Sequence, residues 1–179
     1  KRCGSLGEIS VFSFTPHKII TTGQGGMILL DKLKYKKIID DLKLFNRSKD
    51  KSDWHKGFGL NFKFTDLQAS LGLSQFDNLE KFVKKKKAIA NIYKKRIKNE
   101  NLEVGTFSEN ETPWFFDVQF KSQEYKKNTI QNLSRNNIET RESYPALSKQ
   151  KYLKDVERTD LSISEKIYNT LLWLPSSHN

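Results

Sequence analysis

The sequence predicts an α/β fold built in two parts, and three observations lead to this prediction. Two short apolar segments, residues 8–14 and 25–31, are rich in β-branched and aromatic residues, as buried strands are. Residues 65–97 keep apolar side chains at helical spacing. After residue 113, strand-like and helix-like segments alternate on a smaller scale. Strands that alternate with helices are typical of α/β and α+β designs.

The first part begins with two strands joined by a polar loop. The sequence EISVFSF (residues 8–14) predicts the first strand, and GGMILLD (residues 25–31) predicts the second. Residues 31–45 have apolar side chains near helical spacing and predict a helix. Residues 46–63 are polar and punctuated by glycines, and loops of that length inside a domain are usually functional or disordered.

The clearest helix start lies at TDLQASLG, where Thr65 and Gln68 form a T-x-x-Q capping box. Gly72 and residues 76–78 are expected to divide the following region into two helices. The apolar positions expected to share one face are Leu67, Leu71, Leu79, Phe82, Ile89, Tyr93 and Ile97.

The second part has shorter elements. The alternating sequence PWFFDVQF (residues 113–120) predicts a half-buried strand, and residues 122–137 predict an amphipathic helix that opens at a Ser122 N-cap. A short strand ending at Pro145 should follow, and then a short helix with a Ser162 cap and a stop at Pro175. A boundary near Phe82 would separate residues 1–82 from a smaller unit, residues 83–179.

The 179-residue chain is strongly basic, with a formal net charge of +11. Nucleic-acid binders cluster Arg and Lys with exposed aromatic side chains, whereas the lysines here are spread out and densest at residues 81–98. We favour a solvated helix face over a nucleic-acid surface, and an anionic small substrate fits the charge equally well. We therefore expect no nucleic-acid partner. We also expect no membrane partner, because no apolar run approaches the roughly 20 residues of a membrane span.

The cysteine and histidine content argues against a metal site. Cys3 is the only cysteine, so no disulfide framework or Cys-based zinc site can form within one chain, and a cytoplasmic location is expected. His17, His55 and His178 are far apart and have no paired ligands. The chain does not begin with Met, and we expect it to be part of a longer protein.

Lys18, in TPHKIITTGQGG, is the first candidate for chemistry. It follows a strand that ends near Ser13 and precedes Gly23, Gly25 and Gly26, which permit tight backbone geometry. A surface lysine is the default interpretation, but a lysine in a partly dry site can attack a carbonyl and form a Schiff base. A P-loop is excluded because Lys18 precedes the glycines, and GQGG lacks the dinucleotide spacing.

Two stretches together resemble one family, the DegT-type nucleotide-sugar aminotransferases. GSLGEISVFSFTPHKIITTGQGGMILL resembles the segment with the cofactor lysine, and WHKGFGLNFKFTDLQASLGLSQFDNLEKF resembles the family's G-[YF]-N-[YF]-R-[MF]-[ST]-[DE]-[IL]-Q-A-A-x-G segment. NNIETRESYPALSKQ matches the family's G-I-x-T-R…P-x-H-x-Q more weakly, and LWLPSS is similar to its LPL strand. The matches occur in order along nearly the whole chain, and they look most like perosamine-synthase-type members.

The resemblance implies a fold-type-I enzyme that uses pyridoxal 5'-phosphate (PLP). Residues 1–82 would be the C-terminal portion of the PLP-binding large domain, and residues 83–179 the small α+β domain. Family members are much longer than this chain. Their Asp for the pyridine nitrogen, their phosphate turn and their ring-stacking aromatic lie upstream of the position of Lys1, so we expect a fragment that lacks the N-terminal half.

The resemblance also implies roles for five residues. Lys18 stands where the family has its Schiff-base lysine, and Ser13 matches the serine that hydrogen-bonds the cofactor phosphate. Asn61 matches the asparagine that reaches the phosphate from the partner subunit, which implies a homodimer with shared active sites. Lys63 falls where the family often has a substrate-contacting Arg, and Ser148 where it often has a His near the sugar.

The implied activity is transfer of an amino group, from glutamate, to a nucleotide-linked keto sugar. A 4-keto-6-deoxyhexose is the expected sugar, used in bacterial surface-polysaccharide or glycan precursor synthesis. A dehydratase branch of the family has His at the lysine position, but here Lys18 is in register and His17 is one residue early, which favours transamination. A basic binding module with an inherited fold and no chemistry is a further alternative. Gln24 and Lys63 depart from the family's Glu and Arg, and Lys lacks the bidentate geometry of Arg.

Overall fold

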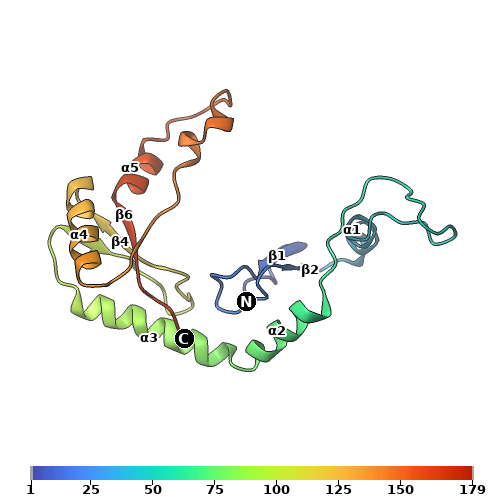
Figure 1. Cartoon of the computed structure of the whole chain (residues 1–179), viewed down its shortest axis with the longest axis horizontal. Coiled ribbons are helices and arrows are strands. Elements are labelled where there is room, and N and C mark those ends of the chain that lie inside the picture. The colour runs from blue at the N-terminus through green and yellow to red at the C-terminus, as the bar shows by residue number, and fades with distance from the viewer. Residues whose placement is uncertain (1, 179) are drawn as a thin grey trace. The chain divides into compact units, whose positions relative to one another are not determined.

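The computed structural model describes residues 2–178 and divides the chain into two compact units, Lys1–Glu80 and Lys81–Asn179. Each unit is described by itself. Figure 1 labels helices α1 to α5 and strands β1, β2, β4 and β6.

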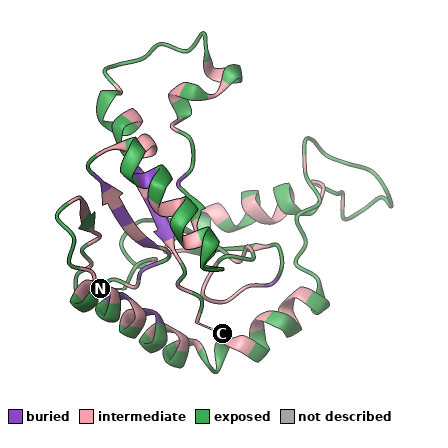
Figure 2. Cartoon of the chain, turned by 60° about the vertical axis from the view of Figure 1, so that its left-hand side comes forward, coloured by how far each residue is buried: buried purple, intermediate pink, exposed green. Residues whose placement is uncertain are grey.

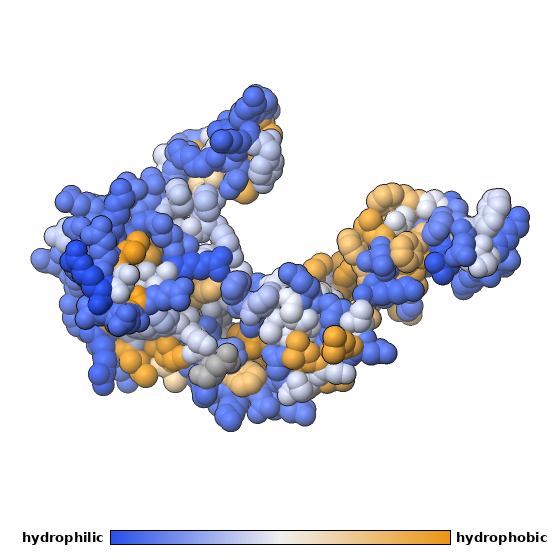
Figure 3. Space-filling view, in the orientation of Figure 1, coloured by the Kyte–Doolittle hydropathy of each residue, from blue (hydrophilic) through white to orange (hydrophobic). Residues whose placement is uncertain are grey.

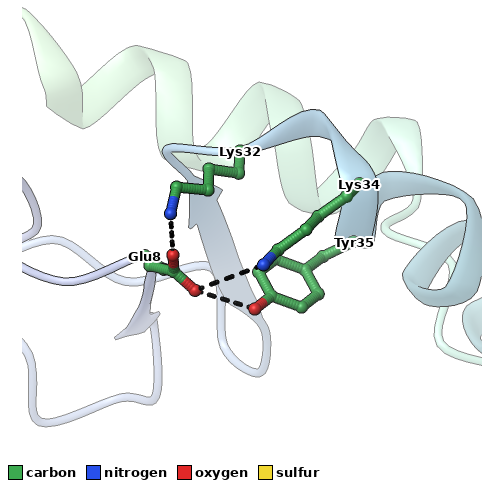
Figure 4. A network of polar contacts seen from close by, with 4 residues as sticks. All are labelled: Glu8, Lys32, Lys34 and Tyr35. Atoms are coloured by element: carbon green, nitrogen blue, oxygen red, sulfur yellow. Dashed lines mark hydrogen bonds and ion pairs between the residues drawn. The ribbon is translucent and has the colours of Figure 1, made fainter.

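The first unit contains a two-stranded antiparallel sheet. Both predicted strands are present, but the expectation that they are buried is wrong, because their side chains are mostly exposed. Strand β1 (Ile9–Ser13) pairs with β2 (Gly26–Leu30), with Ser13 opposite Gly26. A network around Glu8 ties the start of β1 to the 3-10 helix η1 (Leu33–Tyr35) that follows β2 (Figure 4). The Glu8 carboxylate accepts hydrogen bonds from Lys32 Nζ and, at 2.7 Å, from the Tyr35 hydroxyl. These bonds, the one from Lys32 first, hold the pKa of Glu8 below its usual value.

Helix α1 (Lys36–Lys43) is shorter than the predicted helix over residues 31–45. It ends because Phe45 and Asn46 take positive φ angles of 63° and 49°, which turns the chain out of the helix. The predicted long loop follows. It is closed at its base by a bridge between Leu44 and Asn61, and Gly59 is required there because a Cβ would lie 2.2 Å from the Phe45 carbonyl carbon.

Helices α2 (Asp66–Phe76) and α3 (Leu79–Arg96) confirm the predicted division of the long helical region. The capping box is also confirmed, because the Thr65 side chain accepts from the Gln68 N–H and the Gln68 side chain accepts from the Thr65 N–H. The predicted apolar face is not buried over α2, where Leu67 is 82% and Leu71 is 46% exposed. Figure 3 shows apolar side chains at the surface over α1 and α2.

The second unit is built on a four-stranded antiparallel sheet in the order β3 (Leu102–Val104), β4 (Phe116–Phe120), β6 (Leu171–Leu174), β5 (Arg141–Glu142). The alternation predicted for residues 113–120 is present, with Phe116, Val118 and Phe120 buried. Figure 2 shows that buried positions gather on the strands. The three-residue strand β3 was not predicted, because so short a segment shows no periodicity.

Helix α3, which belongs to this unit from Lys81 on, and the helices α4 and α5 complete it. Helix α4 (Gln123–Arg135) begins as predicted, with the Ser122 hydroxyl accepting from the Tyr125 N–H at 3.2 Å. Helix α5 (Ser162–Thr170) ends before the predicted stop, because the chain enters the sheet directly as β6. The predicted Ser162 cap is wrong. Leu161 occupies the N-cap position, and Ser162 bonds Asp160 instead.

The buried core lies between this sheet and its helices. It consists of Ala90, Phe116, Val118, Phe120 and Leu172, with Tyr93, Ile97 and Ile130 among the partly buried residues packed on it.

A buried lysine corrects one expectation. The lysine-rich helix was predicted to be solvated, but Lys86 is only 6% exposed. Its Nζ donates to the carbonyls of Trp114 at 2.7 Å and Ser176 at 2.8 Å, so it fastens two other segments of the unit to α3. Burial lowers the pKa of Lys86. Across residues 2–178, no helix is long and apolar enough to cross a membrane.

Candidate functional site

Lys18 lies on the connection between β1 and β2, in a tight turn. Its backbone N–H donates to the Thr15 carbonyl at 3.0 Å, which closes a turn over Pro16 and His17. Proline suits the second position of such a turn because its ring fixes φ near the required value. The turn leaves His17 exposed and Lys18 half-buried, so these neighbouring residues have different surroundings.

Two hydroxyl groups lie on the same connection. The Ser13 Oγ, at the end of β1, lies 3.2 Å from the Thr15 Oγ1 and accepts from the Thr15 N–H at 3.4 Å. The structure therefore places Ser13 and Lys18 on one short segment, together with Thr15, which no sequence motif indicated. A primary amine and paired hydroxyls are groups that attack carbonyls and bind phosphate oxygens.

The glycine-rich half of the connection returns against its first half. The Phe14 carbonyl accepts from the Thr22 N–H at 3.0 Å, and the Phe14 N–H donates to the Gly25 carbonyl at 2.9 Å. Gly25 has a φ of +146°, and a Cβ there would lie 2.5 Å from the ring of Phe64. The Phe64 ring also meets the Phe14 ring edge-on, with centroids 6.3 Å apart. Glycine is therefore needed at position 25 for Phe64 to pack on the turn.

Helix α2 holds this turn through two glutamines, Gln68 and Gln75, which we call the glutamine clamp. The Gln75 side chain pairs with both backbone groups of Thr21, donating to the carbonyl at 2.7 Å and accepting from the N–H at 3.1 Å. The Gln68 Nε2 donates to the Gln24 carbonyl at 2.7 Å. Because the two glutamines are seven residues apart, they lie on one face of the helix.

Gly72 lies between the two glutamines on that face, and a Cβ there would lie 3.0 Å from Thr22 Cγ2. The close approach brings the helix onto the turn. The sequence pattern predicted only the capping-box role of Gln68, and it did not indicate Gln75. Their spacing of seven residues on a helix was the available signal.

Asn61 and Lys63 lie on a different segment of the first unit, the one that leads into α2. Asn61 forms the bridge with Leu44, and both Asn61 and Lys63 are exposed. They are not part of the β1–β2 connection.

Ser148 lies in the second unit, in the 3-10 helix η2 (Leu147–Lys149). Its hydroxyl donates to Glu165 Oε1 at 2.8 Å, and Lys149 Nζ pairs with the other carboxylate oxygen at 2.7 Å. Hydrogen bonds from Lys149 and then Ser148 lower the pKa of Glu165. The hydroxyl of Ser148 therefore already has an acceptor within its own unit.

In the described part of the chain, residues 2–178, no three His, Cys, Asp or Glu side chains are grouped so that they could hold a metal ion. The chemistry available on the β1–β2 connection is that of the Lys18 amine, the hydroxyl groups and the exposed imidazole of His17.

The fold and the match to a family model define the class of protein. An aminotransferase of known crystal structure, TlmJ from Streptoalloteichus hindustanus, matches with a TM-score of 0.86 at 23% identity, over 98% of this chain and 48% of that chain. The fold is thus the α/β fold of an aminotransferase. The family model of the DegT/DnrJ/EryC1/StrS aminotransferase family matches residues 1–179, so the chain belongs to that family. The predicted family and fold class are both confirmed.

Curated relatives include two GDP-perosamine synthases. The chain is 34% identical to that of Escherichia coli O157:H7 over 144 residues, which are 79% of this chain and 39% of the relative. It is 32% identical to that of Vibrio cholerae in an alignment 186 residues long, which covers 98% of this chain and 49% of the relative. The chain spans half or less of the length of these relatives.

Proposed function

We propose that the protein containing this chain is a PLP-dependent aminotransferase that transfers an amino group from glutamate to a nucleotide-linked keto sugar. The family to which the chain belongs depends on PLP. The observation that carries the proposal is Lys18, in the family's lysine register, half-buried on a connection that α2 holds. The similarity to GDP-perosamine synthases supports a nucleotide-linked sugar, and we propose a 4-keto-6-deoxyhexose.

The residues of the connection fit this cofactor by their chemistry. PLP presents an aldehyde and a phosphate. The Lys18 amine is a nucleophile for the aldehyde carbon, and the hydroxyls of Ser13 and Thr15 can donate to phosphate oxygens. Gly23 has open space at the position of a Cβ, so the backbone there leaves room for a bound group.

Bound PLP supplies the electron sink that makes the α-carbon of the amino donor acidic. Lys18 Nζ would hold the cofactor at its aldehyde carbon, with loss of water, and as a free amine it would carry a proton between the α-carbon of the amino donor and C4′. The glutamine clamp fixes the backbone of Thr21 and Gln24, which holds the connection that carries Lys18 in place. In the half-reaction with the sugar, the same lysine would move the proton in the opposite direction.

Further parts of the proposal concern the complete enzyme. Asn61 would reach the cofactor phosphate of the partner subunit in a homodimer, and Lys63 and Ser148 would contact the substrate. Residues 1–82 would complete the large domain and residues 83–179 would form the small domain. The enzyme would act in the cytoplasm, in the synthesis of bacterial surface polysaccharides or glycan precursors.

Borohydride trapping in the complete natural protein tests the role of Lys18. After incubation with PLP and reduction, peptide mass spectrometry should find the cofactor on the peptide that contains Lys18. Lys18→Ala should abolish this adduct, and Lys37→Ala, at an exposed lysine of α1, should leave it unchanged. An undiminished adduct in Lys18→Ala would overturn the assignment.

The dehydratase alternative differs in its product. A dehydratase removes a hydroxyl from the sugar with no net gain of an amine, whereas the proposed enzyme produces an amino sugar and 2-oxoglutarate. The half-buried Lys18 beside the exposed His17 favours amino transfer. A salt-sensitive affinity for nucleic acid without any reducible adduct would favour a binding module instead.

A further inference from the structure

One face of the sheet in the second unit carries a row of chemically distinct residues. Asp117 on β4 lies opposite Trp173 on β6, and Trp173 lies opposite Arg141 on β5. Side chains alternate along a strand. The side chains of this row therefore project from the face of the sheet opposite to that of Phe116 and Val118, which fill the core. The row therefore does not contribute to the core between sheet and helices.

Aromatic rings surround the guanidinium of Arg141. Its Cζ lies 5.2 Å from the ring centre of Tyr144, 5.6 Å from that of Trp173 and 5.9 Å from that of Phe115. The rings support one another, because Phe115 stacks on Trp173 at 4.2 Å and Tyr144 meets Trp173 edge-on at 5.1 Å. We call Phe115, Arg141, Tyr144 and Trp173 the arginine–aromatic cluster. All three distances are within the range of cation–π attraction, which restricts the position of the guanidinium.

The hydrogen-bonding capacity of Arg141 is not used within the chain. Among residues 2–178 its guanidinium makes no hydrogen bond and no ion pair, although it carries five N–H donors. The two carboxylates of neighbouring positions have other partners: Glu142 pairs with Lys126 at 2.8 Å, and Asp117 accepts from the Trp173 side chain. An arginine that is held by rings but has no carboxylate partner is ready to bind an anion, and its planar fork matches the oxygens of a phosphate.

The rings beside Arg141 offer a second kind of contact. Tyr144 is 53% exposed, and Trp114, whose ring centre lies 4.6 Å from that of Phe115, is 37% exposed. Exposed aromatic rings stack on nucleobases, and such stacking tolerates any base. An anion-binding group with an aromatic surface next to it matches a ligand that carries both phosphate and base.

We propose that the arginine–aromatic cluster binds the nucleoside diphosphate portion of the substrate, with Arg141 on the phosphate oxygens and Tyr144 against the base. The proposal rests on the proposed function, which requires a nucleotide-linked sugar. The net charge of +11 adds a general attraction for such an anion.

Titration calorimetry with GDP and UDP as probes tests this proposal in the complete natural protein without added PLP. Arg141→Gln should weaken binding by about 10- to 100-fold, the usual cost of a charge-assisted hydrogen-bonded pair. Arg141→Lys should recover only part of the affinity because lysine lacks the fork. Tyr144→Leu should weaken binding and Tyr144→Phe should preserve it. Arg135→Gln, on α4, is the matched control and should bind as the parent does.

Inorganic phosphate and glutamate serve as comparison ligands, because each carries an anionic group but no nucleobase. The proposal expects GDP to bind at least tenfold more tightly than either ion, by the stacking contribution of the base. Equal affinity of Arg141→Gln and the parent for GDP, absence of GDP binding by the parent, or tighter binding of glutamate than of GDP would each overturn it. Borohydride trapping at Lys18 is read separately: an adduct without GDP binding contradicts this inference alone, and GDP binding without an adduct contradicts the proposed function alone.

Discussion

At the scale of single residues, Asp117 shows how burial changes the behaviour of a carboxyl group. Burial raises the pKa of Asp117 above its usual value, and the hydrogen bond from Trp173 offsets only part of this effect. The folded state therefore holds the proton more tightly than the unfolded chain does. The contribution of Asp117 to stability is complete below its unfolded pKa and is lost as the pH rises through its folded pKa.

Asp117→Asn removes this titration and keeps an oxygen that can accept from Trp173. We expect the variant to equal the parent near pH 3 and to exceed its free energy of unfolding at pH 7 by about 1 kcal/mol or less, because the side chain is half-buried and water screens it. Urea unfolding at the two pH values measures the difference. A stability difference between variant and parent that is the same at both pH values would contradict the explanation.

Other single residues show what the sequence pattern can and cannot reveal. Thr65 and Ser122 were identified as helix caps because a cap is a local pattern of a few positions, and both caps are present. Ser162 is also a hydroxyl residue at a helix start, but its hydroxyl and its N–H both donate to the Asp160 carboxylate. No spacing rule indicated these hydrogen bonds. Lys86 was placed with its exposed neighbours, because its carbonyl partners at Trp114 and Ser176 are distant in sequence.

At the scale of elements, α2 links the two stretches that resemble one family. The segment GLNFKFTDLQASLG builds the helix, and the helix holds TTGQ through the glutamine clamp. The sequence predicted the helix that begins after Thr65. It also placed Lys18 between a strand and a glycine-rich turn. It did not predict that the helix holds the turn, because these hydrogen bonds use backbone groups of Thr21 and Gln24 that any residue would supply.

Gln75→Ala should release the backbone of Thr21, because it removes the donor and the acceptor that pair with it. We expect the loss of about 1 to 3 kcal/mol from the local stability of the connection, since two partly buried backbone groups lose their partners. Hydrogen exchange at the Thr21 and Thr22 amides measures it. Ser70→Ala, at an exposed position of the same helix, is the control and should change neither rate. Unchanged exchange in Gln75→Ala would show that α2 does not hold the turn.

At the scale of the whole chain, the two units differ in how much they bury. The core cluster lies entirely in the second unit, where Phe116 and Leu172 are fully buried on neighbouring strands. Within residues 2–80, Thr22 is the only buried residue, and apolar residues such as Val11 and Leu67 are 74% and 82% exposed. A two-stranded sheet without a buried face is only marginally stable in water.

We therefore expect the two sheets of the isolated 179-residue chain to differ in hydrogen exchange. The amides of β4 and β6 should exchange more slowly than those of β1 and β2, by a factor on the order of 100 or more, because opening the central strands exposes the core. Hydrogen exchange followed by peptide mass spectrometry measures this difference. Strand β3 lies at the edge of the same sheet as β4 and serves as an internal comparison, with an intermediate rate expected. Equal protection of β1 and β4 would mean that burial of apolar side chains does not set the local stability of this chain.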